Sequence, residues 1–171
     1  INGGIAWYEN DGSQNFTPHE IFATGSALSV FAVDLDRDGD LDVLFTGGIP
    51  DSKPAWFEND GSQNFTARTI TATADGARSV FAADVDRDGD LDVLSASYYH
   101  GDILWYENDG SQNFTARIAF DRPQSNQGKG YLFAADVDGD GDMDVLGSAP
   151  SINGEIAWYE NDGSQNFTAR S

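Results

Sequence analysis

Hydrophobic and polar positions along this chain change over short segments, and no segment keeps a sustained helical period of apolar residues. Within residues 79–130, the apolar run 80–83 predicts a strand buried on both faces, and 91–97 predicts the next strand. Segments 103–107 and 114–118 are rich in β-branched and aromatic residues, and the Asn-Asp-Gly-Ser between them has turn chemistry. The pattern therefore predicts four strands per repeat in an all-β fold.

Two blocks recur in strict alternation along the chain. The first is an aromatic hairpin typified by IAWYENDGSQNFT, and the second is an acidic block typified by SVFAADVDRDGDLDVLS. The hairpin occurs four times and the acidic block three times, and the hairpin tryptophans are Trp7, Trp56, Trp105 and Trp158. Their spacings of 49, 49 and 53 residues match one β-propeller blade or a similar β-repeat. We expect tandem four-stranded antiparallel β-propeller blades, about 3.5 repeats in all.

The repeats divide the chain into a half repeat at 1–28 and three full repeats at 29–78, 79–130 and 131–171. The polar, Gly-rich segment 122–130 is an insertion that predicts an exposed loop. One repeat of this size cannot cover both of its own faces. We therefore interpret the chain, which starts at Ile1 without a leader pattern, as a mature or excised piece of a longer array, or as part of an assembly.

Each acidic block contains a nine-residue loop with Asp at positions 1, 3, 5, 7 and 9 and Gly at position 6. Positions 1, 3 and 5 of a curling loop point toward a common centre, position 7 can add its main-chain oxygen, and position 9 closes the shell. Such hard oxygen ligands select Ca²⁺ over zinc or copper, which predicts three Ca²⁺ sites. The candidate residues are Asp34, Asp36, Asp38, Asp40 and Asp42 in loop 1, Asp84, Asp86, Asp88, Asp90 and Asp92 in loop 2, and Asp136, Asp138, Asp140, Asp142 and Asp144 in loop 3.

Two other interpretations of these loops agree less well with the sequence. An EF-hand-type loop closes with an acidic residue at position 12 and is flanked by helices, whereas position 12 here is Phe45, Ser95 or Gly147. A solvated acidic turn would not reproduce the glycine and the apolar position 8 three times. The metal-loop interpretation is favoured over both.

The charge of the chain follows from these loops. They contain 15 of its 29 acidic residues, and three bound Ca²⁺ would change the formal charge from −20 to −14. A surface this acidic argues against nucleic acid and anionic membranes as partners. No apolar run is long enough for membrane insertion, and the absence of cysteine excludes disulfides and thiolate metal sites.

The sequences DLDRDGDLDVL, DVDRDGDLDVL and DVDGDGDMDVL, each after a Phe-Ala strand, resemble the FG-GAP and VCBS-type repeats of integrin α-subunit propellers and secreted bacterial proteins. The resemblance covers nearly the whole chain and includes the tryptophan hairpins. It implies Ca²⁺ in the turn between the first two strands of a blade, propellers that commonly have seven blades, and an extracellular or cell-surface role in adhesion or ligand binding. The number of repeats here departs from seven.

The hairpin aromatics suggest two uses. The tryptophans are expected to pack in the core, with sugar stacking as the alternative. The residue after each tryptophan should point to the opposite face of the strand, which makes it the better candidate for a ligand-binding surface. These residues are Tyr8, Phe57, Tyr106 and Tyr159.

Other polar motifs carry weaker signals. Asn15, Asn64, Asn113 and Asn166 each begin an N-glycosylation sequon, although asparagine is also an ordinary turn residue. The two histidines, His19 and His100, lie near no repeated nucleophile, so we predict that the chain is not an enzyme.

Two functional hypotheses follow from the sequence. The first is an extracellular calcium-binding propeller module that binds glycans or a protein ligand. The second is a structural repeat that self-assembles into an oligomer or fibre, or acts as a spacer in a large surface protein. The near-identity of the four hairpins favours the second slightly, because specificity usually resides in loops that vary.

Overall fold

The computed structural model describes residues 3–23, 25–47, 52–73, 76–99, 101–120, 130–149 and 155–170. Strands and turns form all of these segments, so the all-β prediction is confirmed. The strands are β1 Ile5–Asn10, β2 Phe16–Phe22, β3 Ala27–Val33, β4 Asp42–Gly47, β5 Lys53–Asn59, β6 Phe65–Thr69, β7 Ala77–Ala83, β8 Asp92–Ser97, β9 Ile103–Asn108, β10 Phe114–Phe120, β11 Leu132–Ala135, β12 Asp144–Ala149, β13 Glu155–Asn161 and β14 Phe167–Arg170.

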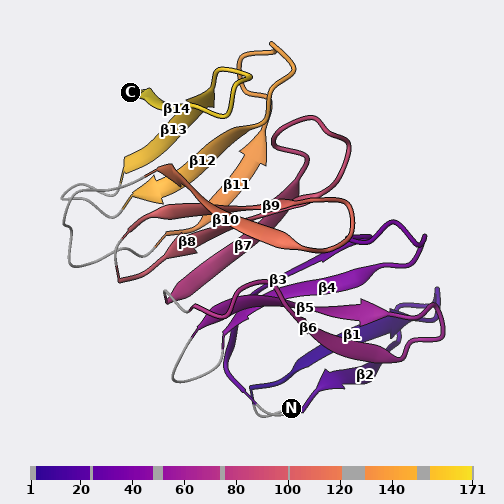
Figure 1. Cartoon of the computed structure of the whole chain (residues 1–171). Coiled ribbons are helices and arrows are strands. Elements are labelled where there is room, and N and C mark those ends of the chain that lie inside the picture. Colours follow the sequence, from indigo (N-terminus) through magenta and orange to yellow (C-terminus); the bar gives the residue numbers. More distant parts are fainter. Residues whose placement is uncertain are drawn as a thin grey trace.

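The strands form three complete antiparallel blades and one half-blade. Blade 1 has the strand order β3-β4-β5-β6, blade 2 β7-β8-β9-β10 and blade 3 β11-β12-β13-β14, while β1 and β2 pair as a separate hairpin, the half-blade. Within each blade the strands pair in the order in which they follow along the chain, so each blade is a simple meander. The prediction of about 3.5 four-stranded repeats is confirmed (Figure 1).

The strands of blade 2 lie where the hydrophobic pattern predicts them. The segments 80–83, 91–97, 103–107 and 114–118 correspond to β7, β8, β9 and β10. The largest difference is at β7, which begins three residues before the apolar run, at Ala77. A register shift between Ala77 and Ser79 extends the pairing with β8 to Ser97. The exposed loop predicted at 122–130 lies outside the described residues except for Gly130.

The turns of the hairpins are stabilised by their own polar side chains. In blade 1 the carboxylate of Asp60 accepts hydrogen bonds from the backbone N–H groups of Ser62 and Asn64, and Asn64 Nδ2 donates to Asp60 Oδ2 at 2.8 Å. The same Asp–Asn bond recurs in the other three hairpins. The sequon asparagines therefore act as turn residues, as the sequence suggested.

The core lies between blades rather than within one blade. Trp56 and Leu44 of blade 1 pack against Val80 and Val93 of blade 2. One blade further along, Trp105 of blade 2 packs in a cluster with Leu132 and Val145 of blade 3, among others. Burial of Trp56 and Trp105 confirms the expected core role for these two tryptophans. Blade 2 thus has apolar neighbours on both of its faces.

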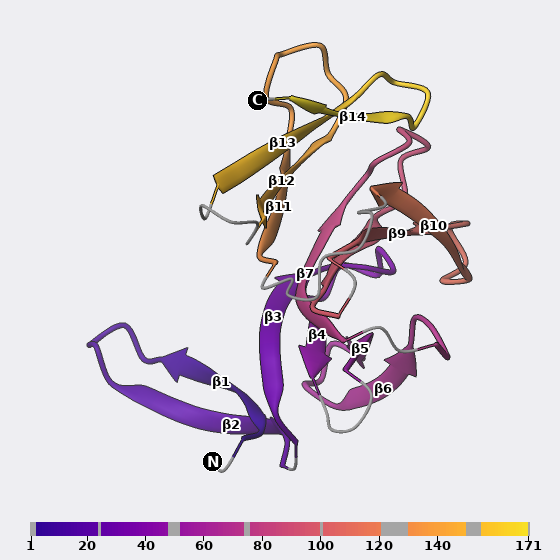
Figure 2. The ribbon, with the colours of Figure 1, turned by 90° about the vertical axis from the view of Figure 1, so that its left-hand side faces the viewer.

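The first strands of the blades lie side by side along the centre of the molecule (Figure 2). Their phenylalanines form a continuous row, with ring centroids 4.5 Å apart for Phe31 and Phe81 and 4.8 Å apart for Phe81 and Phe133. The later strands of each blade extend outward from this row, and the half-blade projects away from blade 1 in the same view. This is the arrangement of consecutive propeller blades.

Candidate metal sites and inter-blade pocket

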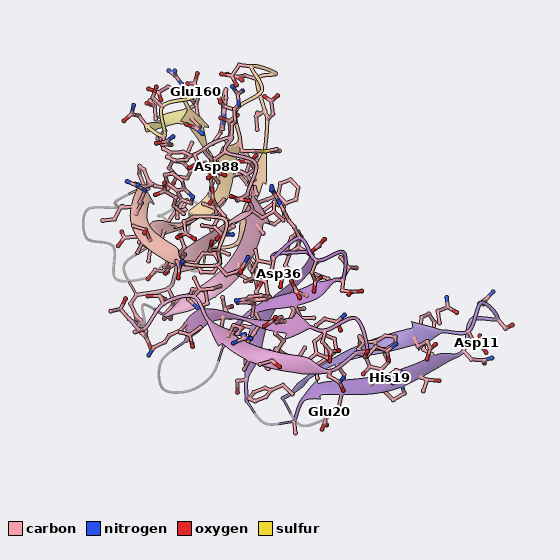
Figure 3. The ribbon with its side chains drawn as sticks, turned by 45° about the vertical axis from the view of Figure 1, so that its right-hand side comes forward. Asp11, His19, Glu20, Asp36, Asp88 and Glu160 are labelled. Carbon is pink, nitrogen blue, oxygen red and sulfur yellow. The ribbon has the colours of Figure 1, made fainter. Side chains whose placement is uncertain are left out.

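The three acidic loops connect the first and second strands of each blade, β3–β4, β7–β8 and β11–β12. Within each loop, one carboxylate oxygen from each of three aspartates lies within 4.8 Å of the others. The three groups are Asp34, Asp36 and Asp42 in loop 1, Asp84, Asp86 and Asp88 in loop 2, and Asp136, Asp138 and Asp144 in loop 3. Figure 3 shows Asp36 and Asp88 at successive levels of the molecule, on neighbouring blades.

The hydrogen bonds of the position-1 aspartate indicate whether a cation fits in the acidic loop. Asp34 Oδ2 accepts the backbone N–H of Gly39 at 3.1 Å, and Asp84 Oδ2 accepts that of Gly89 at the same distance. The second oxygen, Oδ1, of Asp34 and of Asp84 is buried and has no hydrogen-bond partner. A buried carboxylate oxygen without a partner is costly unless a cation meets it. The donor set of loops 1 and 2, all oxygen and strongly anionic, fits Ca²⁺.

The position-9 aspartate has a second task that the sequence did not reveal. Asp42 is fully buried, its Oδ2 accepts the N–H of Leu35 at 2.9 Å, and its Oδ1 accepts the N–H of Asn59 at 2.9 Å. Asp92 and Asp144 make the equivalent pair of bonds in loops 2 and 3. This carboxylate therefore joins the loop to the third strand of the same blade, with or without a metal.

Burial changes the protonation of these groups. Loss of solvation raises the pKa of Asp42 to about 6 and that of Asp92 to about 7, against the opposing effect of the backbone N–H donors. Burial, assisted by neighbouring carboxylates, also raises the pKa of Asp36, Asp86 and Asp138. The shifts show that burial, with a smaller contribution from neighbouring carboxylates, disfavours negative charge in these loops, and a divalent cation would offset that cost.

The remaining predicted ligands are turned elsewhere. The side chain of Asp40 lies against the turn of its own hairpin, so close that a Cβ on Gly61 would come within 2.4 Å of Asp40 Oδ2. Asp90 and Asp142 lie in the same way against Gly110 and Gly163. The metal groups thus exclude the position-7 carboxylates, for which the sequence had suggested main-chain oxygen. At position 5, Asp88 joins a group, whereas Asp38 and Asp140 do not.

A cleft of about 360 Å³ lies between blade 1 and the hairpin turn of blade 2. Its lining residues are Asp36, Trp56, Glu58, Arg68 and Thr69 of blade 1 and Ser111 and Gln112 of the β9–β10 turn. Arg68 Nε donates to Glu58 Oε2 at 2.5 Å, so a guanidinium and a carboxylate are held together on one wall. The volume is within the range of small-molecule sites, and the lining is mostly polar.

The charged pair of this cleft recurs in every hairpin. Glu107 pairs with Arg117, whose guanidinium lies 5.4 Å from the ring centroid of Trp105, and Glu160 pairs with Arg170. In the half-blade, His19 replaces the arginine: it bonds Glu9 at 3.0 Å and stacks on Trp7. Sequence reasoning missed these residues, although Trp-x-Glu followed by Thr-Ala-Arg in three hairpins was a usable signal.

The prediction that the residue after each tryptophan faces the surface is wrong for three of the four positions. Tyr8 is 58 % exposed, but Phe57, Tyr106 and Tyr159 are all buried, Tyr106 at 2 % exposure. Both faces of a blade are covered when blades stack, so alternation along the strand moves a side chain from one buried face to the other. Phe57, for example, packs on Phe22 and Phe45.

Three consecutive four-stranded meanders with an acidic loop after each first strand define a protein built from β-propeller blades. The chain belongs to the FG-GAP-like repeat family, whose model matches residues 2–45, 46–95 and 84–147. Among solved structures, the chain is similar to a lectin of Agrocybe aegerita described by its specific recognition of non-reducing terminal N-acetylglucosamine. The TM-score is 0.61 at 20 % identity, covering 99 % of this chain and 47 % of the lectin.

The chain thus spans about half the length of that lectin, and the likeness shows the propeller fold. No curated protein matches the chain. The described residues contain no helix with the length and apolar character needed to span a membrane.

Proposed function

We propose that this chain is a calcium-stabilised β-propeller module that binds carbohydrate outside the cell and has no catalytic role. The cleft between blades 1 and 2 carries the proposal. It places two carboxylates, a guanidinium, two hydroxyls and an amide around a space of about 360 Å³. Sugar hydroxyls both donate and accept hydrogen bonds, so a wall that offers both kinds of partner suits a sugar better than an apolar ligand.

Calcium has a defined place in this proposal. Asp36 belongs to both the loop 1 group and the lining of the cleft, so an ion in loop 1 would fix one wall of the binding site. The residues that would hold the ions are those of the three carboxylate groups. The ion supplies positive charge that offsets their mutual repulsion, and it stabilises the folded chain by binding only to that state.

The comparisons support a carbohydrate as the ligand class and an extracellular location. The similar Agrocybe aegerita lectin is described as recognising a terminal N-acetylglucosamine, which makes that sugar the first probe to try. Membership of the FG-GAP-like family supports secretion or surface display. By repeat equivalence, Glu107, Arg117 and Trp105 of blade 2 with the β13–β14 turn would form a second site.

The test is calorimetric titration of the whole chain with an oligosaccharide that ends in non-reducing N-acetylglucosamine, in millimolar calcium. Arg68→Ala should lower the affinity at least about tenfold at one site, because a charged hydrogen-bond partner is removed, and Arg68→Ala with Arg117→Ala should abolish binding. Arg170→Ala is the matched control, because Arg170 makes the equivalent pair with Glu160 but does not line this cleft. Chelation should lower both the melting temperature and the sugar affinity.

Two outcomes would contradict the proposal. A folded, calcium-loaded chain that binds no sugar on a broad glycan panel would remove the carbohydrate function. An unchanged melting temperature after chelation would show that calcium does not stabilise the fold, and calcium would no longer be part of the proposed function.

One observation favours a structural role as the second candidate. Ile156 of blade 3 is 79 % exposed, whereas the equivalent Ile103 of blade 2 is 5 % exposed because blade 3 covers it. Val30 at the other end of the blade row is also exposed, whereas its equivalent Val80 is buried. Such faces would be covered if chains assembled end to end, or if further blades lay beside them.

A further inference from the structure

Neighbouring acidic loops are joined by an arginine. Arg37 occupies position 4 of loop 1, and its Nη1 lies 2.9 Å from Oδ1 of Asp90, position 7 of loop 2. Arg87 occupies position 4 of loop 2, and its Nε lies 2.8 Å from Oδ1 of Asp142, position 7 of loop 3. The same pairing of position 4 with position 7 occurs at both interfaces, through Nη1 of Arg37 and Nε of Arg87, which makes it a repeated feature and not a chance surface contact.

Arg87 also binds the backbone of the loop that it reaches. Its Nε donates to the carbonyl oxygen of Gly141 at 2.9 Å, and its Nη2 donates to that of Asp140 at 3.2 Å. One guanidinium therefore holds positions 5, 6 and 7 of loop 3. A Cβ at Gly141 would come within 2.6 Å of Arg87 Nη2, so the glycine leaves the space that the guanidinium occupies.

The arginine is in turn positioned by its own loop. Arg37 and Arg87 have left-handed backbone conformations, with φ of 63° and 62°, which residues other than glycine rarely adopt. Each arginine lies between positions 3 and 5 of its own loop, and the carboxylates at those two positions are the ligands that the sequence predicts for that loop. In loop 3, position 4 is Gly139, which has no side chain that could contact the acidic loop of another blade. The shape of one loop thus sets where the arginine meets the next.

We propose that Arg37 and Arg87 couple calcium binding between neighbouring blades, an inference that rests on the calcium binding proposed above. An ion that closes loop 2 fixes the backbone of Arg87, and Arg87 then holds positions 5–7 of loop 3 in the shape that receives an ion. The positive charge of the arginine opposes this effect little, because it is paired with the Asp142 carboxylate, which stands outside the loop 3 metal group. Preorganisation therefore dominates, and the coupling is positive.

Coupling of this kind is reciprocal, so loop 3 promotes binding at loop 2 by the same factor. The arginines are about half exposed, which places the effect at the low end for coupled sites. We expect a change of about three- to tenfold in the dissociation constant of one loop when its neighbour cannot bind.

The test is a calcium titration of the whole chain, labelled with ¹⁵N-glycine and followed by NMR. Gly39, Gly89 and Gly141 are the position-6 residues of the three loops, so their amide signals report each site separately. Asp88→Asn weakens loop 2 while keeping an acceptor for the N–H of Asp90. With Arg87 present, D88N should weaken calcium binding at Gly141 about three- to tenfold. In an Arg87→Gln background, D88N should leave binding at Gly141 unchanged.

Two controls keep the result clear. Arg78→Gln makes the same charge change on blade 2, but Arg78 stacks on Tyr98, so the effect of D88N on Gly141 should persist. Arg87→Lys keeps the charge without the planar guanidinium and serves if Arg87→Gln fails to fold. The parallel pair Asp36→Asn, which weakens loop 1 while keeping an acceptor for the N–H of Asp38, and Arg37→Gln, followed at Gly89, should reproduce the pattern one interface earlier.

The outcomes separate the coupling from the calcium binding beneath it. If D88N changes binding at Gly141 equally with and without Arg87, or in neither background, the coupling through arginine is wrong while calcium binding stands. If none of the three glycine signals responds to calcium, the calcium binding itself is wrong, and the coupling with it.

Discussion

At the scale of single residues, the position-9 aspartates show how one side chain serves two needs. Asp92 is fully buried and holds two backbone N–H groups, one from Val85 in its loop and one from Asn108 at the end of β9. Without a cation nearby, that buried charge is a liability, which is why burial raises its pKa to about 7. In loops 1 and 3 the equivalent carboxylates, Asp42 and Asp144, also belong to the candidate metal groups, so the same position can serve as an anchor and as a candidate ligand.

This balance predicts an unusual pH dependence for the calcium-free chain. The pKa of Asp92 is raised from an ordinary 3.8 to about 7, so between about pH 4 and pH 7 the unfolded chain releases the proton that the folded chain retains. The stability contributed by the protonated group is complete below about pH 4 and is lost as the pH rises through about 7. In excess chelator, the urea midpoint should therefore fall from pH 5 to pH 7.5.

Variants identify the group responsible. Asp92→Asn cannot titrate and should make the decrease shallower, leaving the part that Asp42 contributes through its own raised pKa of about 6. Saturating calcium should remove the decrease because the ion keeps the carboxylates ionised. Asp60→Asn should leave the slope unchanged, because the bond from Asn64 lowers the pKa of Asp60 and places its titration below this window. Equal slopes in D92N and the unmodified chain would show that another group dominates.

The sequence predicted the aspartates of the three loops but not their division of labour. The 1, 3, 5, 7, 9 spacing indicates a metal loop, because alternate residues of a curling segment converge. It does not show that position 9 also binds the N–H of Asn59 or Asn108, since those groups come from the third strand of the folded blade. The spacing also does not show that the position-7 side chain points toward the hairpin turn, because that depends on how the acidic loop packs against the hairpin turn in the folded blade.

At the scale of elements, the hairpin turn is the part that touches the acidic loop most closely. Gly110 lies in the left-handed region, with φ of 76°, and a Cβ there would come within 2.4 Å of Asp90 Oδ2. Gly12 of the half-blade has nearly the same φ, 80°, and no atom within 4 Å of its Cβ position. The chain therefore contains its own control for separating backbone strain from steric contact.

We expect Gly110→Ala to lower the free energy of unfolding by about 2–4 kcal/mol, and Gly12→Ala by about 1 kcal/mol. The difference arises because the alanine of G110A must displace the Asp90 carboxylate, while both variants strain the turn alike. Urea denaturation in calcium measures both, and the Asp90 contact with Arg37 should weaken in G110A alone. Equal losses of unfolding free energy in G110A and G12A would mean that the Asp90 carboxylate moves aside at no cost and that backbone strain accounts for the whole effect.

Elements were predicted better than surfaces. Strand positions follow from alternation and turn chemistry, which are local, and blade 2 confirms them. Which side of a strand is exposed depends on whether another blade covers it, and that is decided by stacking. Tyr8 and Tyr106 occupy the same place in the same motif, yet one is exposed and the other buried, because Tyr106 packs against the preceding blade, blade 1, whereas no part of the described chain forms a blade on that side of Tyr8.

At the scale of the whole molecule, the row of blades has two faces that no other part of the described chain covers fully. Ile156 and Val137 are exposed on blade 3, and Val30 is exposed on the opposite end of the row. Their counterparts between blades, Ile103, Val85 and Val80, are buried. The same pairing of surfaces that holds blade 2 to its neighbours could therefore join one chain to another.

End-to-end assembly makes a measurable prediction. Light scattering over a range of protein concentrations in millimolar calcium should show association, and Ile156→Lys should abolish it by placing a charge in the apolar contact. Ile118→Lys is the matched control, because Ile118 is equally apolar and 62 % exposed but lies on β10, the last strand of blade 2. A chain that stays monomeric at high concentration would exclude self-assembly through these faces. Association that survives Ile156→Lys would instead place the contact elsewhere, with the projecting half-blade, whose Tyr8 is exposed, as the next surface to change.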